Sequence, residues 1–230
     1  MTLFRSMVQW FRSTAAAESP STPAKGQVLA AEPAVPIYFL PPTNAPLRTG
    51  EILSGVIQRR RSFKSLGLES PEIEEIKHPY SVVVTQDCDL EQDYFAREKA
   101  KNTEKAEDKR KLENKQIPNV LLVQATTVEE LIASLPRGGD ILKRVIQNKD
   151  ERYHALEKVQ ATADAQGNGL PALGIDFKRY FTVPTEELYA QLTSGATRRT
   201  HLNSPYLEHF ARRFADFLSR VGLPKEHQVE

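Results

Sequence analysis

The sequence predicts an α+β protein with a mainly β core: a small β-barrel with peripheral helices and a charged helical insert. Short runs of β-branched and apolar residues, bounded by Gly, Pro and Asp, recur along the chain and indicate brief strands. Between two of them, residues 95–116 are rich in Lys, Glu and Ala, as in a solvated helix. A strongly amphipathic helix ends the regular part of the chain.

Five segments are expected to form the strands. The clearest is 78–90, in which residues 81–85 form a continuous apolar run that indicates a strand buried on both faces. The other four are 50–58, 120–124, 152–156 and 170–183, and the proline-bounded segment 36–42 is expected at an edge. Buried strands end where polar groups reach water, so Thr85 and the acidic turn after it predict a site: Gln86, Asp87, Cys88 and Asp89.

Helix starts are expected at four places. Ser70-Pro71 resembles the N-cap and first residue of a helix over 70–74, and residues 184–188 place acids in a first turn. Thr127 and Glu130 have the spacing of a capping box. In the last helix Ser204 is the expected N-cap, residues 222–224 end it, and apolar residues share one stripe: Leu207, Phe210, Phe214, Phe217, Leu218 and Val221.

We expect three regions. Residues 1–46 hold an amphipathic segment (3–11) and a Pro/Ala/Ser-rich linker, 47–224 form the β-barrel domain with inserts at 95–116 and 137–149, and 225–230 are a tail. The amphipathic segment is either a docking or membrane-surface helix or a chain start that packs on its own domain. The insert at 95–116 is either a plain solvated arm or an arm that faces RNA.

Composition narrows the function classes. The 230 residues carry a formal net charge of +1, so only a local basic patch could attract nucleic acid or a membrane surface. The single cysteine excludes an internal disulfide, and the histidines lack metal-ligand spacing, so we expect no metal and no cofactor. No apolar run approaches the roughly 20 residues of a membrane helix, and the N-terminus lacks the apolar core of a signal peptide. These features predict a cytoplasmic protein without a membrane span.

Two basic segments could contact phosphate. Arg59, Arg60, Arg61 and Lys64 follow the first strand beside an aromatic residue, and they form either a phosphate grip or a solvated loop. Arg152, together with Tyr153 and His154, would suit a phosphate or a stacked base. His154 has the pKa range for acid–base work, although a lone strand histidine is more often packed and hydrogen-bonded.

Cys88 and its neighbours are weaker candidates. Two flanking carboxylates disfavour the thiolate, so Cys88 is expected to be a structural thiol. Asp87 and Asp89 are expected to cap backbone N–H groups rather than to hold a divalent ion.

The strand order GEILSGV, HPYSVVVTQD, VLLVQAT, RYHAL, LPALGIDF, followed by closing helices, resembles the Src-homology-3-like barrel of the PemK/MazF family of toxin–antitoxin toxins over about 47–224. The segments TQDCDL, RYHAL and SRVGLP also resemble a group of uncharacterised bacterial proteins. The first resemblance implies metal-independent cleavage of single-stranded RNA, which needs a base, an acid and a cation near the phosphate.

The family's motif can be matched to this sequence residue by residue. The aspartate of its Arg-x-Asp pair then falls at Asp176, and the arginine falls at Gly174. Arg179 could substitute if the backbone bends. Thr85 corresponds to the Ser or Thr after the second strand, and residues 59–61 correspond to the basic loop.

Three functions follow as hypotheses. The first is a non-catalytic or weakly catalytic interaction module in a bacterial stress or defence complex, with a protein partner that is a complex subunit or antitoxin-like. The second is an endoribonuclease that uses Asp176, Arg179, His154 and Thr85. The third is an RNA-binding module, and a homodimer is compatible with each. Convergence of His154, Arg179 and Asp176 in one groove would favour the enzyme, whereas a groove filled by residues 36–42 or by the terminal helix would disfavour it.

Overall fold

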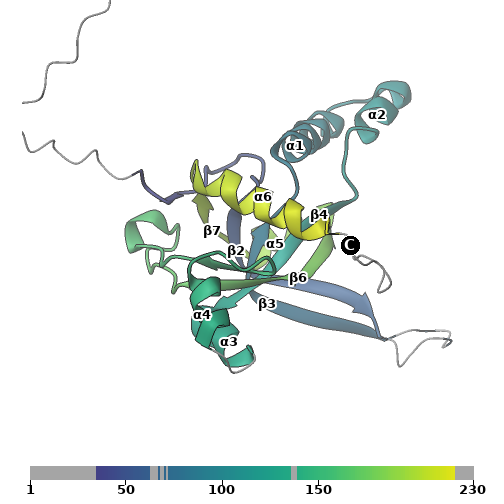
Figure 1. Ribbon diagram of the computed structural model, residues 1–230. Helices are drawn as coiled ribbons and strands as arrows, with labels where there is room; N and C mark the ends of the chain where they lie inside the picture. Colours follow the sequence, from purple (N-terminus) through teal and green to yellow (C-terminus); the bar gives the residue numbers. More distant parts are fainter. Residues whose placement is uncertain (1–34, 63–66, 68–69, 71, 136–138, 221–230) are drawn as a thin grey trace, which may run out of the picture. The chain divides into compact units, whose positions relative to one another are not determined.

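The computed structural model describes residues 35–62, 67, 70, 72–135 and 139–220. Their strands form one antiparallel sheet in the order β1-β7-β2-β3-β4-β6-β5 (Figure 1). The strands are β1 (Tyr38–Phe39), β2 (Glu51–Arg61), β3 (Ile73–Val83), β4 (Asn119–Thr127), β5 (Tyr153–Leu156), β6 (Leu173–Pro184) and β7 (Thr197–Leu202). In the described part no pairing joins β1 to β5, so the sheet is not closed into the expected barrel. The chain is α+β with an antiparallel β core, as predicted.

The central strands are buried on both faces, as the continuous apolar run predicted. Val82 and Val83 of β3 are both fully buried, and they belong to two different core clusters. Ile52 and Leu53 of β2 likewise belong to two different core clusters. Successive side chains of a strand point to opposite faces, so these pairs show that each face carries its own core.

The described helices are α1 (Asp87–Lys101), α2 (Ala106–Glu113), α3 (Val128–Ser134), α4 (Gly139–Ile146), α5 (Thr185–Ser194) and α6 (Tyr206–Leu218). Helix α6 packs three phenylalanines onto one face, whereas α5 and the start of α1 supply Leu188 and Leu90 to the other. Leu131 of α3 and Val145 of α4 pack with Tyr153 of β5 in a third cluster. Helices α1 and α2 form an arm at one end of the sheet, and α3 and α4 lie at another (Figure 1).

Several local predictions are confirmed. Thr127 and Glu130 make both hydrogen bonds of the capping box, and α5 begins at Thr185 with Glu186 and Glu187 in its first turn. The segment 36–42 contributes the edge strand β1. The insert at 95–116 is helical, because it contains the second half of α1 and all of α2.

Others are wrong. Residues 72–74 do not enter a helix, because Ile73 and Glu74 pair with Arg61 and Arg60 as the start of β3. Residues 86–89 are not a turn: Gln86 is the N-cap of α1, and the helix begins at Asp87. Ser204 is not the cap of the last helix, since α6 begins at Tyr206 after Pro205. Strand β7 was not expected.

Some predictions fall outside the described residues. These are the amphipathic segment 3–11, most of the linker, Lys64, Pro71, the helix end at 222–224 and the tail at 225–230. Among the helices that are described, none is both long enough and apolar enough to cross a membrane.

Candidate functional site

Asp176 lies in a bulge of β6. On β4, Val123 pairs with Tyr180 and Ala125 pairs with Ile175, so the single residue Gln124 lies opposite residues 176–179 of β6. A bulge of this kind bends its strand and redirects side chains. Asp176 is thereby turned toward β5, where its pairing partner is Tyr153.

The arginine that pairs with Asp176 comes from the neighbouring strand. Arg152, the residue before β5, donates Nε and Nη2 to the two carboxylate oxygens of Asp176 at 2.7 and 2.5 Å. Burial alone would raise the pKa of Asp176, but hydrogen bonds from Arg152 and from the Lys178 amide lower it below its usual range. Arg179 is more remote, with Nε 3.9 Å from the same carboxylate. Asp176 is therefore an ionised group held by two arginines.

Gly174, where the family resemblance would place an arginine, has no room for a side chain. A Cβ built on Gly174 would lie 2.6 Å from Cδ2 and 2.7 Å from Cβ of Leu131. Leu131 is the buried residue of α3, which begins directly after β4. Helix α3 thus occupies the space in which an arginine at position 174 would start.

His154 is buried against α6, and its contacts are separate from this ion pair. Its Nδ1 accepts a hydrogen bond from Nε of Arg213 at 3.1 Å, and its ring lies against Phe177 and Phe210. Burial, and then the charges of Arg213 and His209, lower the pKa of His154 to about 3. His154 is neutral near pH 7 and has no hydrogen bond to Asp176 or Arg179 among the described contacts.

Thr85 has a structural role. Its hydroxyl accepts a hydrogen bond from the Leu121 amide at 2.7 Å, and its carbonyl accepts one from the Thr49 hydroxyl at 2.6 Å. Leu121 lies four residues along β4 from Ala125, which pairs beside the Asp176 bulge. The predicted catalytic set is therefore not brought together: only Arg179 lies near Asp176.

The residues of the predicted basic loop lie in a β-strand instead. Arg59, Arg60 and Arg61 end β2 and pair with the start of β3. Arg59 forms ion pairs with Glu75 and Glu187, and Arg60 forms one with Glu74. Acidic partners on β3 and α5 thus offset much of the positive charge that suggested a phosphate grip.

The residues of the predicted acidic turn begin α1. Asp87 accepts hydrogen bonds from the Thr49 amide at 2.6 Å and from Arg48 at 2.8 Å, which fixes the helix to the chain before β2. Cys88 is an exposed free thiol, 3.7 Å from oxygens of Gln86 and Asp89. In the described part of the chain, no three His, Cys, Asp or Glu side chains come together as metal ligands.

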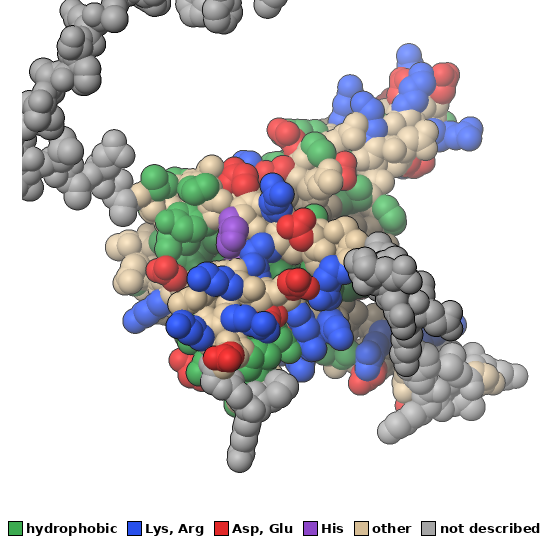
Figure 2. All heavy atoms as spheres, in the orientation of Figure 1, with side chains coloured by type: hydrophobic (Ala, Val, Ile, Leu, Met, Phe, Trp, Pro, Cys, Tyr) green, Lys and Arg blue, Asp and Glu red, His purple; other side chains and the backbone are tan. Residues whose placement is uncertain are grey.

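A basic surface extends from Arg152. A cavity of about 360 Å³ is lined by Arg144, Lys149, Arg152, Arg220 and two acids, Asp150 and Glu151. Figure 2 shows Lys and Arg side chains gathered on this face between α6 and α3–α4, with Asp and Glu side chains among them. The sequence pointed to Arg152 but not to the other three, because they come from separate segments.

Comparison of the chain with models of protein families gives no match, and neither do comparisons with curated proteins and with solved structures.

Proposed function

We propose that this protein is a non-catalytic interaction module, derived from a PemK/MazF-like toxin barrel, that serves a protein complex in bacterial stress or defence. The observation that supports this proposal is the separation of the predicted catalytic groups. Asp176 is held by Arg152, His154 is covered by α6, and Thr85 joins β3 to β4. A nuclease would need a base and an acid on opposite sides of one phosphate.

The curvature of the sheet supports the proposed origin. Strands β2 and β6 are not neighbours in the sheet, yet they contact each other. Leu53 and Val56 of β2 share a core cluster with Phe181 and Val183 of β6, and His78 stacks on Phe181 with ring centroids 3.8 Å apart. A sheet rolled in this way fits an opened small barrel.

An RNA cleavage assay tests the proposal. Purified protein would be incubated with a pool of single-stranded RNA, with and without EDTA, beside Asp176→Ala and the matched variant Glu151→Ala. Glu151 is an exposed acid on the same face, with a loose ion pair to Arg220 at 3.6 Å. We expect no cleavage by any of the three proteins. Cleavage in EDTA that persists in Glu151→Ala and disappears in Asp176→Ala would establish the alternative, a metal-independent endoribonuclease.

Passive RNA binding is the second candidate, and the basic surface around Arg152 favours it because four Lys and Arg side chains line one cavity there. Arg144 and Arg220 expose 59% and 41% of their side chains, so a phosphate could reach them. If this surface binds RNA, Arg144→Glu should weaken binding and reduce its salt dependence. Arg60→Glu, on β2, should change neither the affinity for RNA nor its salt dependence.

A further inference from the structure

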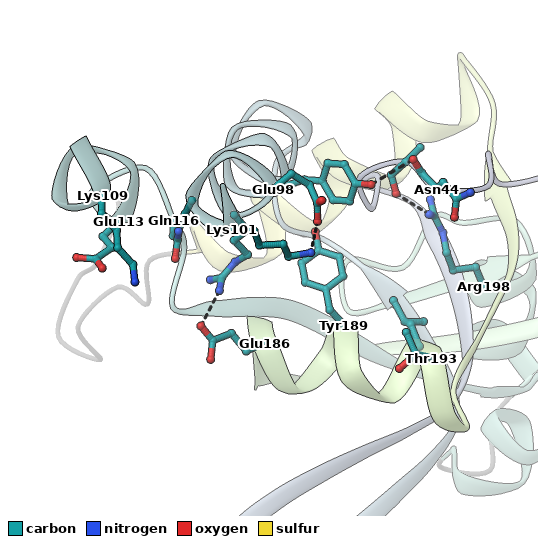
Figure 3. A pocket seen from close by; sticks show the side chains of 15 residues that line it. Asn44, Glu98, Lys101, Lys109, Glu113, Gln116, Glu186, Tyr189, Thr193 and Arg198 are labelled. Carbon is teal, nitrogen blue, oxygen red and sulfur yellow. Dashed lines mark hydrogen bonds and ion pairs between the residues drawn. The ribbon is translucent and has the colours of Figure 1, made fainter. Parts of the chain in front are cut away.

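A groove separate from the Asp176 site lies between the arm and α5. This cavity of about 790 Å³ is shown in Figure 3, and we call it the arm groove. Tyr94 of α1 and Tyr189 and Leu192 of α5 supply its large apolar surfaces. Charged residues form much of its rim: Arg97, Glu98, Lys101, Lys109, Glu113, Glu186 and Arg198. Its size and its mixture of aromatic and charged groups are typical of binding sites.

A buried ion pair fixes one wall of the arm groove. Arg97 of α1 donates Nε to both carboxylate oxygens of Asp93, and Asp93 is fully buried. The same guanidinium reaches Glu186 of α5 at 2.9 Å and the carbonyl of Ile117 at 3.0 Å. Arg97 therefore joins α1 both to α5 and to the chain that leaves α2. A groove held open in this way loses little conformational freedom when a ligand binds.

The hydroxyl of Tyr189 is a hydrogen-bonding group without a partner in the described structure. Burial, and then the charge of Asp93, raise the pKa of Tyr189 to about 12, so the hydroxyl keeps its proton near pH 7. Figure 3 shows Glu98 and Lys101 near the hydroxyl end of Tyr189, and these two residues form an exposed ion pair of 2.5 Å. Exposed pairs are weak, so an incoming carboxylate can replace Glu98 on Lys101 and approach Tyr189.

The charge of the arm favours an acidic ligand. Residues 95–116 contain eight Lys and Arg against five Asp and Glu. Among these residues, which are all described, the acids without an ion pair are Glu104 and Glu113, whereas the cations without one are Lys99, Lys105, Lys109, Arg110 and Lys115. Of these unpaired residues, Lys109 and Glu113 line the arm groove, and its lining as a whole has four Lys and Arg against three Glu. An acidic segment in the arm groove would therefore meet a small excess of positive charge, to which the neighbouring cations of the arm add.

We propose that the arm groove binds an acidic peptide segment of a partner protein, with an apolar or aromatic side chain placed between Tyr94, Tyr189 and Leu192. This inference rests on the proposed function as an interaction module, and it specifies where the partner binds and which chemistry the partner offers. Carboxylates of the segment pair with Lys101 and Lys109 at the rim.

Fluorescence anisotropy with the full chain tests this inference. Three fluorescein-labelled peptides would be compared: repeats of Glu-Glu-Leu-Phe, the same peptide with Lys for Glu, and the same peptide with Ser for Leu and Phe. We expect the first to bind at least about tenfold more tightly than either of the others, with an affinity that falls as salt rises.

Two matched variants locate the site. Lys109 lines the arm groove, whereas Lys115 is an exposed, unpaired lysine of the same arm outside it. Lys109→Glu should weaken binding of the acidic peptide by roughly 3- to 10-fold, and Lys115→Glu by less than about 2-fold. Circular dichroism would verify that both variants keep their helices.

Several results would overturn the inference: no binding of the acidic peptide, equal binding of all three peptides, equal effects of the two lysine variants, or displacement of the peptide by single-stranded RNA. Because RNA cleavage is measured separately, a nuclease result would overturn the proposed function while leaving the peptide measurement interpretable.

Discussion

Arg152 and Asp176 form a bidentate ion pair between the start of β5 and the bulge of β6, with N–O distances of 2.7 and 2.5 Å. They are separated by 24 residues in the sequence. The arginine comes from the residue before the adjacent strand, whereas Gly174, the position at which the family resemblance would place an arginine, lies against Leu131. An acid held by such a pair is poorly suited to accept a proton, which agrees with a binding role.

Breaking this pair should show that its role is structural. The side chain of Asp176 is 7% exposed and that of Arg152 is 37% exposed, so we expect a coupling energy of about 1–2 kcal/mol, which solvent reduces from the value of a fully buried pair. A double-mutant cycle with Arg152→Ala and Asp176→Asn, measured by urea unfolding, would give this value. Arg179→Ala should cost less than about 0.5 kcal/mol. A coupling energy near zero would show that Arg152 is free to bind a ligand.

The strands were predictable wherever the apolar pattern determined burial. Val82 and Val83 are buried on opposite faces because a continuous apolar run has no solvent face, and that property is local. The capping box of Thr127 and Glu130 is also local. The prediction of a closed barrel needed the pairing of strands distant in sequence, and such pairing is not visible in any single segment.

The errors arose where tertiary pairing overrode a local signal. Ser70 and Pro71 resemble a helix start, but the following residues extend the β2–β3 hairpin, in which Arg60 pairs with Glu74. Asp87 resembles a turn residue, but Thr49 and Arg48 bind its carboxylate at the first turn of a helix. The separation of His154 from Asp176 depends on the position of α6, which no motif encodes.

Gly174→Ala should destabilise the fold. The added Cβ would overlap Leu131, including its Cβ, which cannot move without α3. We expect a loss of about 1–3 kcal/mol in the free energy of unfolding, as for other overpacked cores.

Gly195→Ala is the matched control. Apart from its chain neighbours, nothing lies within 4 Å of the position that a Cβ would take at Gly195. It should change stability by less than about 0.5 kcal/mol. Equal effects of the two substitutions in urea unfolding would refute the argument that α3 blocks the motif position.

The ion pair between Arg199 of β7 and Asp164 should be among the most sensitive sites of the fold. Nε and Nη2 of Arg199 donate to the two carboxylate oxygens at 2.7 Å each, and the Asp164 side chain is fully buried. Arg199→Ala leaves that carboxylate with only backbone donors, so we expect a loss of about 3–5 kcal/mol. Arg212→Ala, which breaks an exposed pair of 3.8 Å with Asp216, should cost less than about 0.5 kcal/mol. If Arg199→Ala lowered the free energy of unfolding by less than Arg212→Ala does, the pair of Arg199 and Asp164 would not be a sensitive site of the fold.

His154 should make stability fall as the solution becomes mildly acidic. Its pKa is about 3 in the folded protein and near the ordinary value of 6.5 in the unfolded chain, so the unfolded chain binds the extra proton first. The stabilisation is therefore complete above the unfolded pKa and is lost as pH falls toward the folded pKa. Between about pH 7 and about pH 5.5, His154 alone should account for about 1 kcal/mol.

The comparison of wild type with His154→Gln isolates this contribution, because the amide can still accept from Arg213 but cannot titrate. Urea unfolding at both pH values should give a smaller pH dependence for His154→Gln. His209→Gln serves as the control, since its ring centroid lies 5.6 Å from that of His154 but its side chain is exposed. An unchanged slope in His154→Gln would mean that His154 is accessible to protons in the folded state, and His154 would then again be a candidate for acid–base catalysis.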